Sequence, residues 1–170
     1  MTFSFVFPGQ GSQSIGMQKE LAHQYPIVIE TYQEAEEILG FDLWGIVQNG
    51  PKESLNQTMV TQPAMLTAGI AAWRVWLAVG GAQPKMMAGH SLGEYSALVA
   101  AGAIEFGTTV KLVRKRAELM QSAISEGEGG MAAILGLEDE AIIEICQASS
   151  QDGIAEAVNF NSPGQVVVAG

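Results

Sequence analysis

A pentapeptide near the middle of the chain, Gly89-His90-Ser91-Leu92-Gly93, matches the G-x-S-x-G pattern that surrounds nucleophilic serines. It lies between a short, mostly apolar run and a segment rich in alanine and leucine, which predicts a tight turn between a strand and a helix. Such a turn would expose the hydroxyl group of Ser91, and the helix dipole would favour negative charge at that atom. Ser91 is therefore our candidate nucleophile. The alternative is a serine that only caps the helix N-terminus.

A serine that carries an acyl group also needs two donors for the oxyanion that forms during the reaction. The turn supplies one of them, the backbone N–H of Leu92. Gly9-Gln10-Gly11 is a candidate for the other, because flanking glycines let backbone amides approach a ligand closely. These glycines and Gly16 do not have the spacing of a dinucleotide-binding fingerprint, and a plain turn is the remaining alternative.

The helix predicted over residues 108–125 carries a charged residue on its apolar face. When its residues are placed about 100° apart around the axis, one broad face is apolar. The members of this face are Val110, Leu112, Val113, Ala117, Leu119, Met120, Ala123 and Ile124. Arg116 falls inside the same arc. A guanidinium keeps its charge there and must be paired, either with a protein carboxylate such as that of Glu94 or with an anionic ligand.

The chain is acidic overall, with a formal net charge of −10, which argues against a general affinity for nucleic acid. Four of its eight basic residues nevertheless lie within six positions, and Lys111, Arg114 and Lys115 share the polar face of the helix just described. These three residues could help to receive an acidic partner, or they could form an ordinary solvated face.

No residue of the sequence is evident as the general base that Ser91 requires. His90 adjoins the serine on a tight turn and is expected to point elsewhere, and His23 lies in a predicted helix with no visible link to the turn. The two histidines also lack partners at the spacing of metal ligands, so we expect no metal site. Cys146 is the only cysteine, which excludes an internal disulfide bond, and we expect it to pack in the core.

The composition is that of a globular protein, with 170 residues of which 48% are hydrophobic. No apolar run approaches the roughly 20 residues that cross a bilayer. Met1 leads directly into a predicted strand, without a basic segment or a cleavage site. We therefore expect a cytoplasmic protein with no membrane partner.

The scaffold around these residues is predicted to combine strands and helices. Phe3, Phe5 and Phe7 alternate as in a strand over residues 2–7, and a second strand is predicted over 85–88. Helices are predicted over residues 17–25, 27–39, 43–48, 93–104 and 108–125. A longer helix over 63–79 is predicted to begin at Pro63, because proline is favoured at the first helical position. Trp73, Trp76 and Leu77 of that helix are interpreted as core residues.

A glycine-rich connection at residues 127–130 separates a second segment from the first. There we predict a strand over 131–135, a helix over 138–148, a strand over 154–160, a turn over 162–164 and a strand over 165–169. This βαββ order is the first half of a ferredoxin-like unit, which needs another helix and strand to complete its sheet.

Four segments in this order resemble the malonyl-CoA:acyl carrier protein transacylases, and the resemblance runs the whole length of the chain. They are Phe7-Pro8-Gly9-Gln10-Gly11-Ser12-Gln13, Thr61-Gln62-Pro63-Ala64, Gly89-His90-Ser91-Leu92-Gly93-Glu94-Tyr95 and Asn159-Phe160-Asn161-Ser162-Pro163-Gly164-Gln165. The spacing from Ser91 to Arg116 also fits this family.

The resemblance implies a role for each candidate residue. Ser91 would be the acylated nucleophile, the backbone amides of Gln10 and Leu92 would form the oxyanion hole, and Arg116 would bind the free malonyl carboxylate. The implied reaction is ping-pong transfer of malonyl from malonyl-CoA to the phosphopantetheine thiol of acyl carrier protein, in fatty-acid biosynthesis. Malonyl-CoA is a substrate, and no cofactor is implied.

The resemblance also implies an α/β fold, in which a hydrolase-like subdomain with a nucleophile elbow carries a ferredoxin-like insertion. We expect residues 1–127 to belong to the former and 128–170 to the latter, both incomplete in this chain. The catalytic histidine of the family lies beyond the insertion, so no residue here is assigned that role, and we expect the fragment to be inactive alone.

Two other functions are compatible with parts of this pattern. A serine hydrolase would use the same turn and oxyanion hole, but a simple esterase has no use for a carboxylate-binding arginine such as Arg116. A binding module would recognise CoA esters or carrier protein without turnover, and a single-turnover acylation assay would distinguish it from the transferase.

Overall fold

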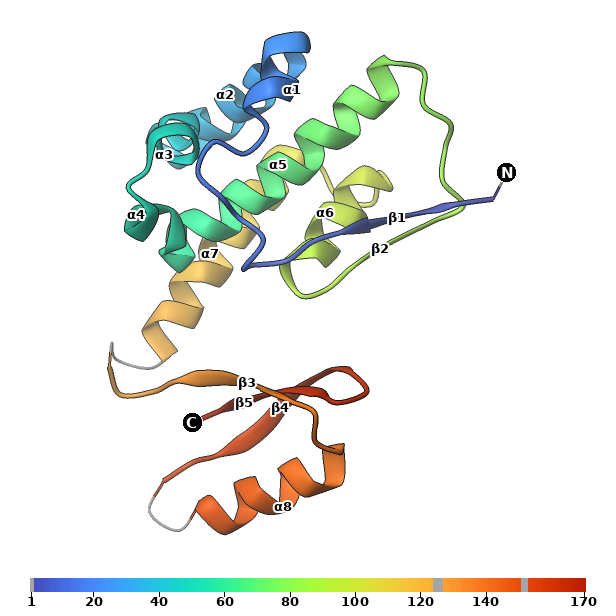
Figure 1. The fold of residues 1–170 in the computed structure, drawn as a ribbon. Coiled ribbons are helices and arrows are strands. Elements are labelled where there is room, and N and C mark those ends of the chain that lie inside the picture. Colours follow the sequence, from blue (N-terminus) through green and yellow to red (C-terminus); the bar gives the residue numbers. More distant parts are fainter. Residues whose placement is uncertain (1, 124–126, 151–152) are drawn as a thin grey trace. The chain divides into compact units, whose positions relative to one another are not determined.

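The computed structural model describes residues 2–123, 127–150 and 153–170. They divide into two compact units, Met1–Gln121 and Ser122–Gly170 (Figure 1). The boundary expected from the glycine-rich connection, between residues 127 and 128, lies a few residues further along the chain. We describe each unit by itself.

The first unit contains two parallel strands, β1 (Ser4–Phe7) and β2 (Met86–Gly89). Their register pairs Phe7 with Gly89, so both strands end at the same edge. Helices α1 to α5 lie between them in the sequence, since parallel strands need a long crossover connection. The loop after β1 and the turn after β2 therefore begin next to each other, and this edge positions the candidate site.

The remaining elements of this unit are helices, and most of them match the predicted segments to within a few residues. They are α1 (Lys19–Gln24), α2 (Ile27–Leu39), α3 (Leu43–Asn49), α4 (Lys52–Asn56), α5 (Thr58–Ala78), α6 (Leu92–Ala100) and α7 (Phe106–Ala123). Residues 124 and 125, which the prediction assigned to the last helix, lie outside the described residues. Helix α4 is not among the predicted helices, because its single turn is too short to show a periodic pattern.

Helix α5 corrects one prediction. It begins at Thr58, so Pro63 lies inside the helix and not at its first position. The first turn of α5, which precedes Pro63, is held by hydrogen bonds from the backbone N–H groups of Val60 and Thr61 to the carbonyl of Gln57, both 2.8 Å long. All residues from Val60 to Ala68 are buried, and a helix that is buried on all sides belongs to the core. The packing of this segment outweighs the hydrogen bond that proline removes.

The aromatic side chains of β1 pack on α5. The ring of Phe5 lies 5.3 Å from those of Trp73 and Trp76, in edge-to-face contact. Trp73 is buried and Trp76 is half-buried, as expected, whereas Leu77 is 41% exposed, so its assignment to the core is wrong. These contacts fix the strand, and with it the start of the following loop, against the central helix.

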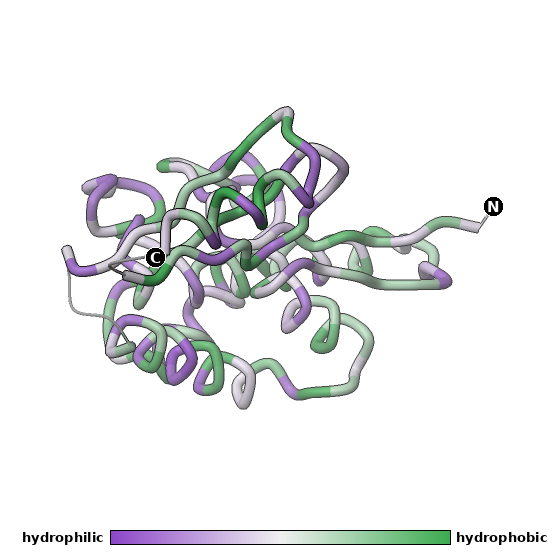
Figure 2. Tube along the Cα trace, turned by 90° about the horizontal axis from the view of Figure 1, so that it is seen from below, coloured by the Kyte–Doolittle hydropathy of each residue, from purple (hydrophilic) through white to green (hydrophobic). Residues whose placement is uncertain are grey.

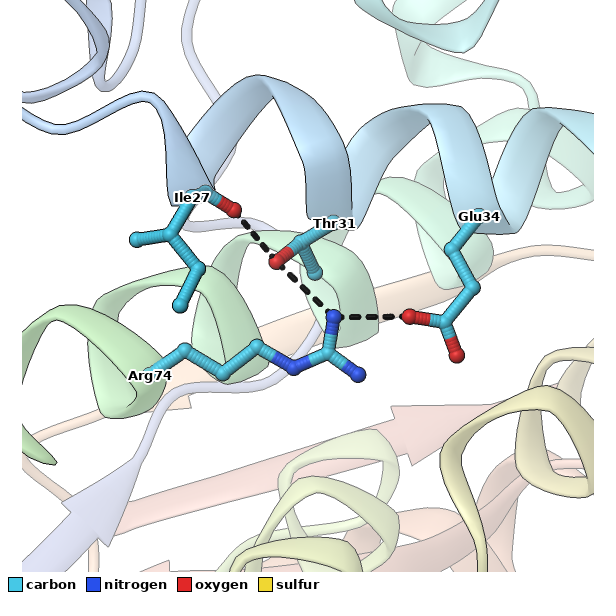
Figure 3. Close-up of polar contacts among 4 residues, drawn as sticks. All are labelled: Ile27, Thr31, Glu34 and Arg74. Atoms are coloured by element: carbon cyan, nitrogen blue, oxygen red, sulfur yellow. Dashed lines mark hydrogen bonds and ion pairs between the residues drawn. The ribbon is translucent and has the colours of Figure 1, made fainter. Parts of the chain in front are cut away.

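A polar cluster joins α2 to α5 beside the apolar core (Figure 3). Arg74 of α5 donates hydrogen bonds to Glu34 at 2.7 Å and to Thr31 Oγ1 at 3.1 Å, and the hydroxyl of Thr31 donates to the carbonyl of Ile27. The guanidinium of Arg74 also lies 5.0 Å from the centre of the Phe106 ring, in α7. Arg74 thus connects α5 to α2 and α7.

Helix α7 is amphipathic. Hydrophilic and hydrophobic residues alternate along the coiled segments of the chain, drawn in purple and green in Figure 2. Val110, Val113 and Ala117 are completely buried, as the helical arrangement predicts. Three other members of the predicted apolar face, Leu112, Leu119 and Met120, are more than two-fifths exposed. The buried stripe of α7 is therefore narrower than the apolar arc of its sequence.

In its described residues, the second unit has a three-stranded antiparallel sheet in the order β3-β5-β4 and one helix. Its elements are β3 (Met131–Leu135), α8 (Asp139–Ser149), β4 (Glu156–Ser162) and β5 (Gln165–Ala169). Strands β3 and β5 have the predicted bounds, while β4 begins two residues late and includes Ser162. Because β4 includes Ser162, the turn before β5 is shorter than the predicted 162–164. Gly164 in this turn has a positive φ angle of 73°, and the pairing of β4 with β5 has two register shifts. Cys146 is buried against Ile142 and Val166, as expected.

Beside α8 the second unit has an apolar hollow of about 480 Å³, lined by residues of β3, α8 and β5 that include Met131, Ile145 and Val168. Ile145 is 54% exposed although it is apolar. None of the helices in the described residues combines the length and the apolar character of a membrane span.

Candidate active site

Ser91 lies on the turn between β2 and α6 with a backbone conformation that is rare for residues other than glycine, φ 54° and ψ −111°. It occupies the N-cap position of α6, but its side chain makes no capping hydrogen bond, and the residue is exposed. The alternative of a serine that only caps the helix is therefore wrong for this hydroxyl. The strained turn presents the Oγ atom at the N-terminus of α6, where the helix dipole favours negative charge.

Close packing brings the loop after β1 to this turn. A side chain on Gly93 would collide with the carbonyl oxygen of Phe7, so the first turn of α6 lies directly against the end of β1. A Cβ atom on Gly9 would approach the carbonyl oxygen of His90 to 2.9 Å. Both contacts require glycine, which explains why the two glycine-containing segments can meet at this edge.

Hydrogen bonds to the start of α5 and the end of α4 hold the loop after β1. Gln13 bonds Asn56 Oδ1 through its Nε2 at 2.9 Å and accepts from the backbone N–H of Gly11 at 2.8 Å. Gln10 Nε2 lies 3.4 Å from Thr58 Oγ1. The side chain of Gln10 thus faces α5, and the segment that contains its backbone amide is tied to α4 at one side and to the turn at the other.

Leu92 is the first residue of α6, and the N–H groups of a first helical turn have no acceptor within the helix. Its side chain is buried, which anchors the residue that follows the serine. The N–H of Leu92 is therefore a donor beside Ser91 that the helix itself does not use.

Arg116 of α7 reaches the serine. Its Nη2 donates to Ser91 Oγ at 2.8 Å and its Nη1 donates to Gln62 Oε1 at 2.6 Å. The Cζ atom lies 5.8 Å from the centre of the Tyr95 ring, so the guanidinium also contacts α6. Within residues 2–121 no carboxylate forms an ion pair with Arg116, and the suggested pair with Glu94 is absent.

The two histidines are the residues to consider as a base for Ser91. Neither His90 nor His23 has a hydrogen bond to Ser91 among the described residues, and His23 lines a separate hollow with Lys19 and Trp44. No group of three or more potential metal-ligating side chains is found in the described part of the chain. The structure thus brings Ser91 and Arg116 together without assigning a base.

The basic face of α7 is largely occupied by contacts within the chain. Arg114 donates to the carbonyl of Leu39 at 2.6 Å, and Glu118 accepts from Lys115 Nζ at 2.9 Å. The hydrogen bond and the charge of Lys115, followed by the charge of Arg114, lower the pKa of Glu118. Lys115 and Arg114 are therefore partly neutralised, although both remain at the surface.

Gln62 is the functional candidate that sequence reasoning did not assign. It belongs to the segment Thr61-Gln62-Pro63-Ala64, which contributed to the family resemblance without a role. No signal in the sequence indicated its role, because the partner of Gln62 lies 54 residues away in another helix. Only the packing of α5 and α7 reveals the contact.

Comparison with known proteins identifies similar sequences and structures. Residues 4–170 match the family model described as acyl transferase domain. A malonyl CoA-acyl carrier protein transacylase of Salmonella typhimurium is 59% identical over 168 residues, which are 99% of this chain and 54% of that protein. The protein of the same name from Bacillus subtilis is 46% identical, over 98% of this chain and 53% of its own length.

Solved structures agree with these sequence matches. A malonyl-transacylase in complex with a type II PKS acyl-carrier protein has a TM-score of 0.96 and 55% identity, covering 100% of this chain and 55% of its own. An acyl carrier protein S-malonyltransferase from Vibrio cholerae has a TM-score of 0.93 and 58% identity, covering 100% and 56%. The chain thus spans about half the length of the proteins it matches.

Proposed function

Because this chain belongs to the acyl transferase domain family, we propose that it carries the nucleophile and the acid-binding residue of an enzyme that transfers malonyl from malonyl-CoA to acyl carrier protein. The observation that carries this proposal is the 2.8 Å contact between Arg116 Nη2 and Ser91 Oγ. A cation held at a strained, exposed serine is suited to an acyl group that ends in a carboxylate. The curated relatives named malonyl CoA-acyl carrier protein transacylase support the same substrate class.

In the first half-reaction the Oγ atom of Ser91 attacks the thioester carbonyl carbon while its proton passes to a general base. The oxyanion receives hydrogen bonds from the backbone N–H groups of Leu92 and Gln10. The C–S bond then breaks, and the departing CoA sulfur takes the proton. The product is a malonyl ester of Ser91.

In the second half-reaction the phosphopantetheine thiol of acyl carrier protein loses its proton to the base and attacks the ester carbonyl carbon. The C–Oγ bond breaks, and Ser91 recovers the proton. Each step exchanges one acyl bond for another without a change of oxidation state, and we propose that no cofactor takes part. The resemblance to the transacylases assigns the base to a histidine beyond the ferredoxin-like segment, and no residue of this chain is given that role.

Arg116 supplies selectivity in this scheme. A malonyl ester has a single methylene between its carbonyl carbon and its free carboxylate, so the charge lies close to Ser91. The guanidinium that bonds the Oγ atom at 2.8 Å is thus within reach of that carboxylate after a small movement. An esterase substrate without a carboxylate would gain nothing from this charge, and the contact therefore favours the transferase over a simple serine hydrolase.

We further propose that the two units are the start of a hydrolase-like subdomain and the first half of a ferredoxin-like subdomain. The parallel strands with a strained turn before α6 support the first assignment. The βαββ order with the sheet order β3-β5-β4 supports the second. The apolar hollow beside α8 is suited to the second helix of such a unit, because it would cover the exposed side chain of Ile145.

The proposed function is tested with an extended chimera, which consists of residues 1–170 followed by the remaining residues of the 59% identical relative. Malonyl-CoA should add one malonyl group to Ser91, as measured by intact mass and peptide mapping, and holo acyl carrier protein should then remove it. Ser91→Ala is the control and should show no adduct. Release of free malonate at a rate that carrier protein does not change would identify a hydrolase, and an adduct that is never released would identify a binding module.

A further inference from the structure

Gln62 accepts a hydrogen bond from Nη1 of Arg116, while Ser91 accepts one from Nη2. We propose that Gln62 is a positioning residue, which fixes the orientation of Arg116 and thereby the preference for acyl groups that end in a carboxylate. The inference rests on the proposed function, in which Arg116 binds the malonyl carboxylate. It assigns to Gln62 no contact with the substrate.

The amide of Gln62 is held at both ends. Its Oε1 accepts from Arg116 Nη1 at 2.6 Å, and its Nε2 lies 3.3 Å from the Sδ atom of Met120. A thioether sulfur accepts hydrogen bonds and does not donate them, while a guanidinium only donates. Rotation of the amide by 180° would therefore lose both contacts, and its oxygen is directed at Arg116.

The position of Gln62 in α5 is rigid. The side chain is completely buried, within the run of consecutive buried residues from Val60 to Ala68. A buried side chain in a packed helix has little freedom to follow a moving arginine. Arg116, by contrast, is only half-buried and has a long, flexible side chain, so the glutamine orients the arginine and not the reverse.

The chemistry of an amide suits this task better than that of other acceptors. A carboxylate at position 62 would neutralise the guanidinium and compete with the carboxylate of the substrate. An apolar side chain would leave an N–H group of Arg116 without a partner and its orientation unfixed. The amide oxygen accepts one hydrogen bond and leaves the full positive charge available.

Acylation of Ser91 affects the two hydrogen bonds of Arg116 differently, because one goes to Ser91 itself and the other goes to Gln62. Acylation of Ser91 converts its Oγ atom into an ester oxygen, which is a poorer acceptor, and places the malonyl carboxylate beside Nη2. The bond from Nη1 to Gln62 is remote from this change. We infer that Nη2 moves from the serine to the carboxylate while Nη1 stays on Gln62, so that the guanidinium rotates about a fixed point.

The test compares malonyl and acetyl transfer by variants of the extended chimera. Gln62→Met has a similar volume and removes the acceptor, whereas Gln62→Glu keeps the shape and adds a charge. The control is Thr67→Val, which changes another completely buried polar residue of α5 whose hydroxyl has no hydrogen bond in the structure. Thermal unfolding reports whether each variant is folded, and kcat and KM are measured separately for both acyl-CoA substrates.

Gln62→Met should lower kcat/KM for malonyl-CoA by about 10- to 150-fold, the range of a hydrogen bond to a charged group, with KM rising more than kcat falls. Acetyl transfer should change by less than about threefold, because a neutral acyl group does not use the arginine. Gln62→Glu should also reduce the preference for malonyl, and Thr67→Val should leave it unchanged. If Gln62→Met does not fold, Gln62→Glu decides, since it preserves the shape of the side chain.

Two results would overturn the inference: equal losses of malonyl and acetyl transfer in both Gln62 variants, or no change in the preference. The companion variant Arg116→Ala separates this failure from that of the proposed function. If Arg116→Ala abolishes the malonyl preference and the Gln62 variants do not, only the role of Gln62 is wrong. If Arg116→Ala leaves the preference intact, the proposed binding of the malonyl carboxylate is wrong as well.

Discussion

Replacement of Arg116 by alanine is the most direct test of how the site selects its substrate. In the structure the guanidinium donates hydrogen bonds to two groups. One is the hydroxyl of the candidate nucleophile Ser91, at 2.8 Å, and the other is the side-chain oxygen of the buried Gln62, at 2.6 Å. Within residues 2–121 the guanidinium has no carboxylate partner, so a substrate carboxylate would be its first counter-ion there. We predict that Arg116→Ala lowers malonyl transfer strongly and leaves acetyl transfer intact or increased.

The size of the effect follows from the hydrogen bonds that the substrate would gain. Arg116 has five N–H donors, of which Gln62 holds one and Ser91 holds another in the free protein. The second becomes available when the serine is acylated. A hydrogen bond to a charged group contributes about 1.5–3 kcal/mol, so loss of one such bond reduces kcat/KM about 10- to 150-fold.

The assay measures kcat/KM for malonyl-CoA and acetyl-CoA in the extended chimera, with Arg116→Lys as a companion variant. Lysine keeps the charge but presents a compact ammonium group, which does not reproduce the paired donors of a guanidinium. We expect Arg116→Lys to retain part of the malonyl preference and to have an activity between those of arginine and alanine. Thermal unfolding of the same samples checks that the site remains folded.

The contact with Ser91 also suggests what would refute this reasoning. A guanidinium that donates to Oγ stabilises the negative charge that develops there during attack by the serine. If that were its main role, Arg116→Ala would reduce malonyl and acetyl transfer by the same factor. Unfolding of the variant would instead indicate a structural role, and either result would contradict the assignment of Arg116 to the malonyl carboxylate.

Three further predictions concern the chain, the turn and the basic face of α7. The 170-residue chain alone should show little or no turnover, because the base for Ser91 is not among its assigned residues, and turnover near that of the extended chimera would contradict this. Gly93→Ala should destabilise the protein by about 1–3 kcal/mol in chemical unfolding, because its new Cβ would collide with β1, while Gly130→Ala, with open space around it, should not. Glu118→Gln should release Lys115 and lower the KM for the acidic carrier protein at low salt, and an unchanged KM would speak against a docking role. The pKa of Glu118 is lowered in the folded state, so its ionised carboxylate stabilises the fold at a pH above its unfolded pKa. Glu118→Gln should therefore be less stable than the unchanged protein in that pH range, and the difference should disappear as the pH falls through the folded pKa.

Elements with a regular pattern could be predicted from the sequence alone. The strands over 131–135 and 165–169 and the helix over 27–39 have the predicted bounds. Glycines flank both strands, and the helix lies between Pro26 and Gly40, so residues that interrupt regular structure mark the ends of each element. The alternating phenylalanines of β1 correctly indicated one buried face of a strand. The pairing of β1 with β2 was not predicted, because the two strands are separated by about half the chain and no local sequence pattern indicates that they pair.

The start of α5 shows why a local rule can fail. Proline is favoured at the first turn of a helix, and on that rule Pro63 marks the beginning. The residues before it, Thr58 to Gln62, have no strong helical preference. Their helix is instead stabilised by tertiary burial, since Val60, Thr61 and Gln62 are all buried, and burial is a property of the folded chain.

The candidate site was predictable to the extent that its residues act through their own element. Ser91 follows from a turn motif, and the inward position of Arg116 follows from the geometry of one helix. Gln62 acts through Arg116, a residue of another helix. The sequence does not tell how α5 and α7 are placed relative to each other, so this contact could not be predicted. Once the structure shows that Gln62 is buried, its polar side chain is expected to have a partner. The arginine on the apolar face of α7 supplies that partner, so the hydrogen bond follows from two structural facts that the sequence of either helix alone does not contain.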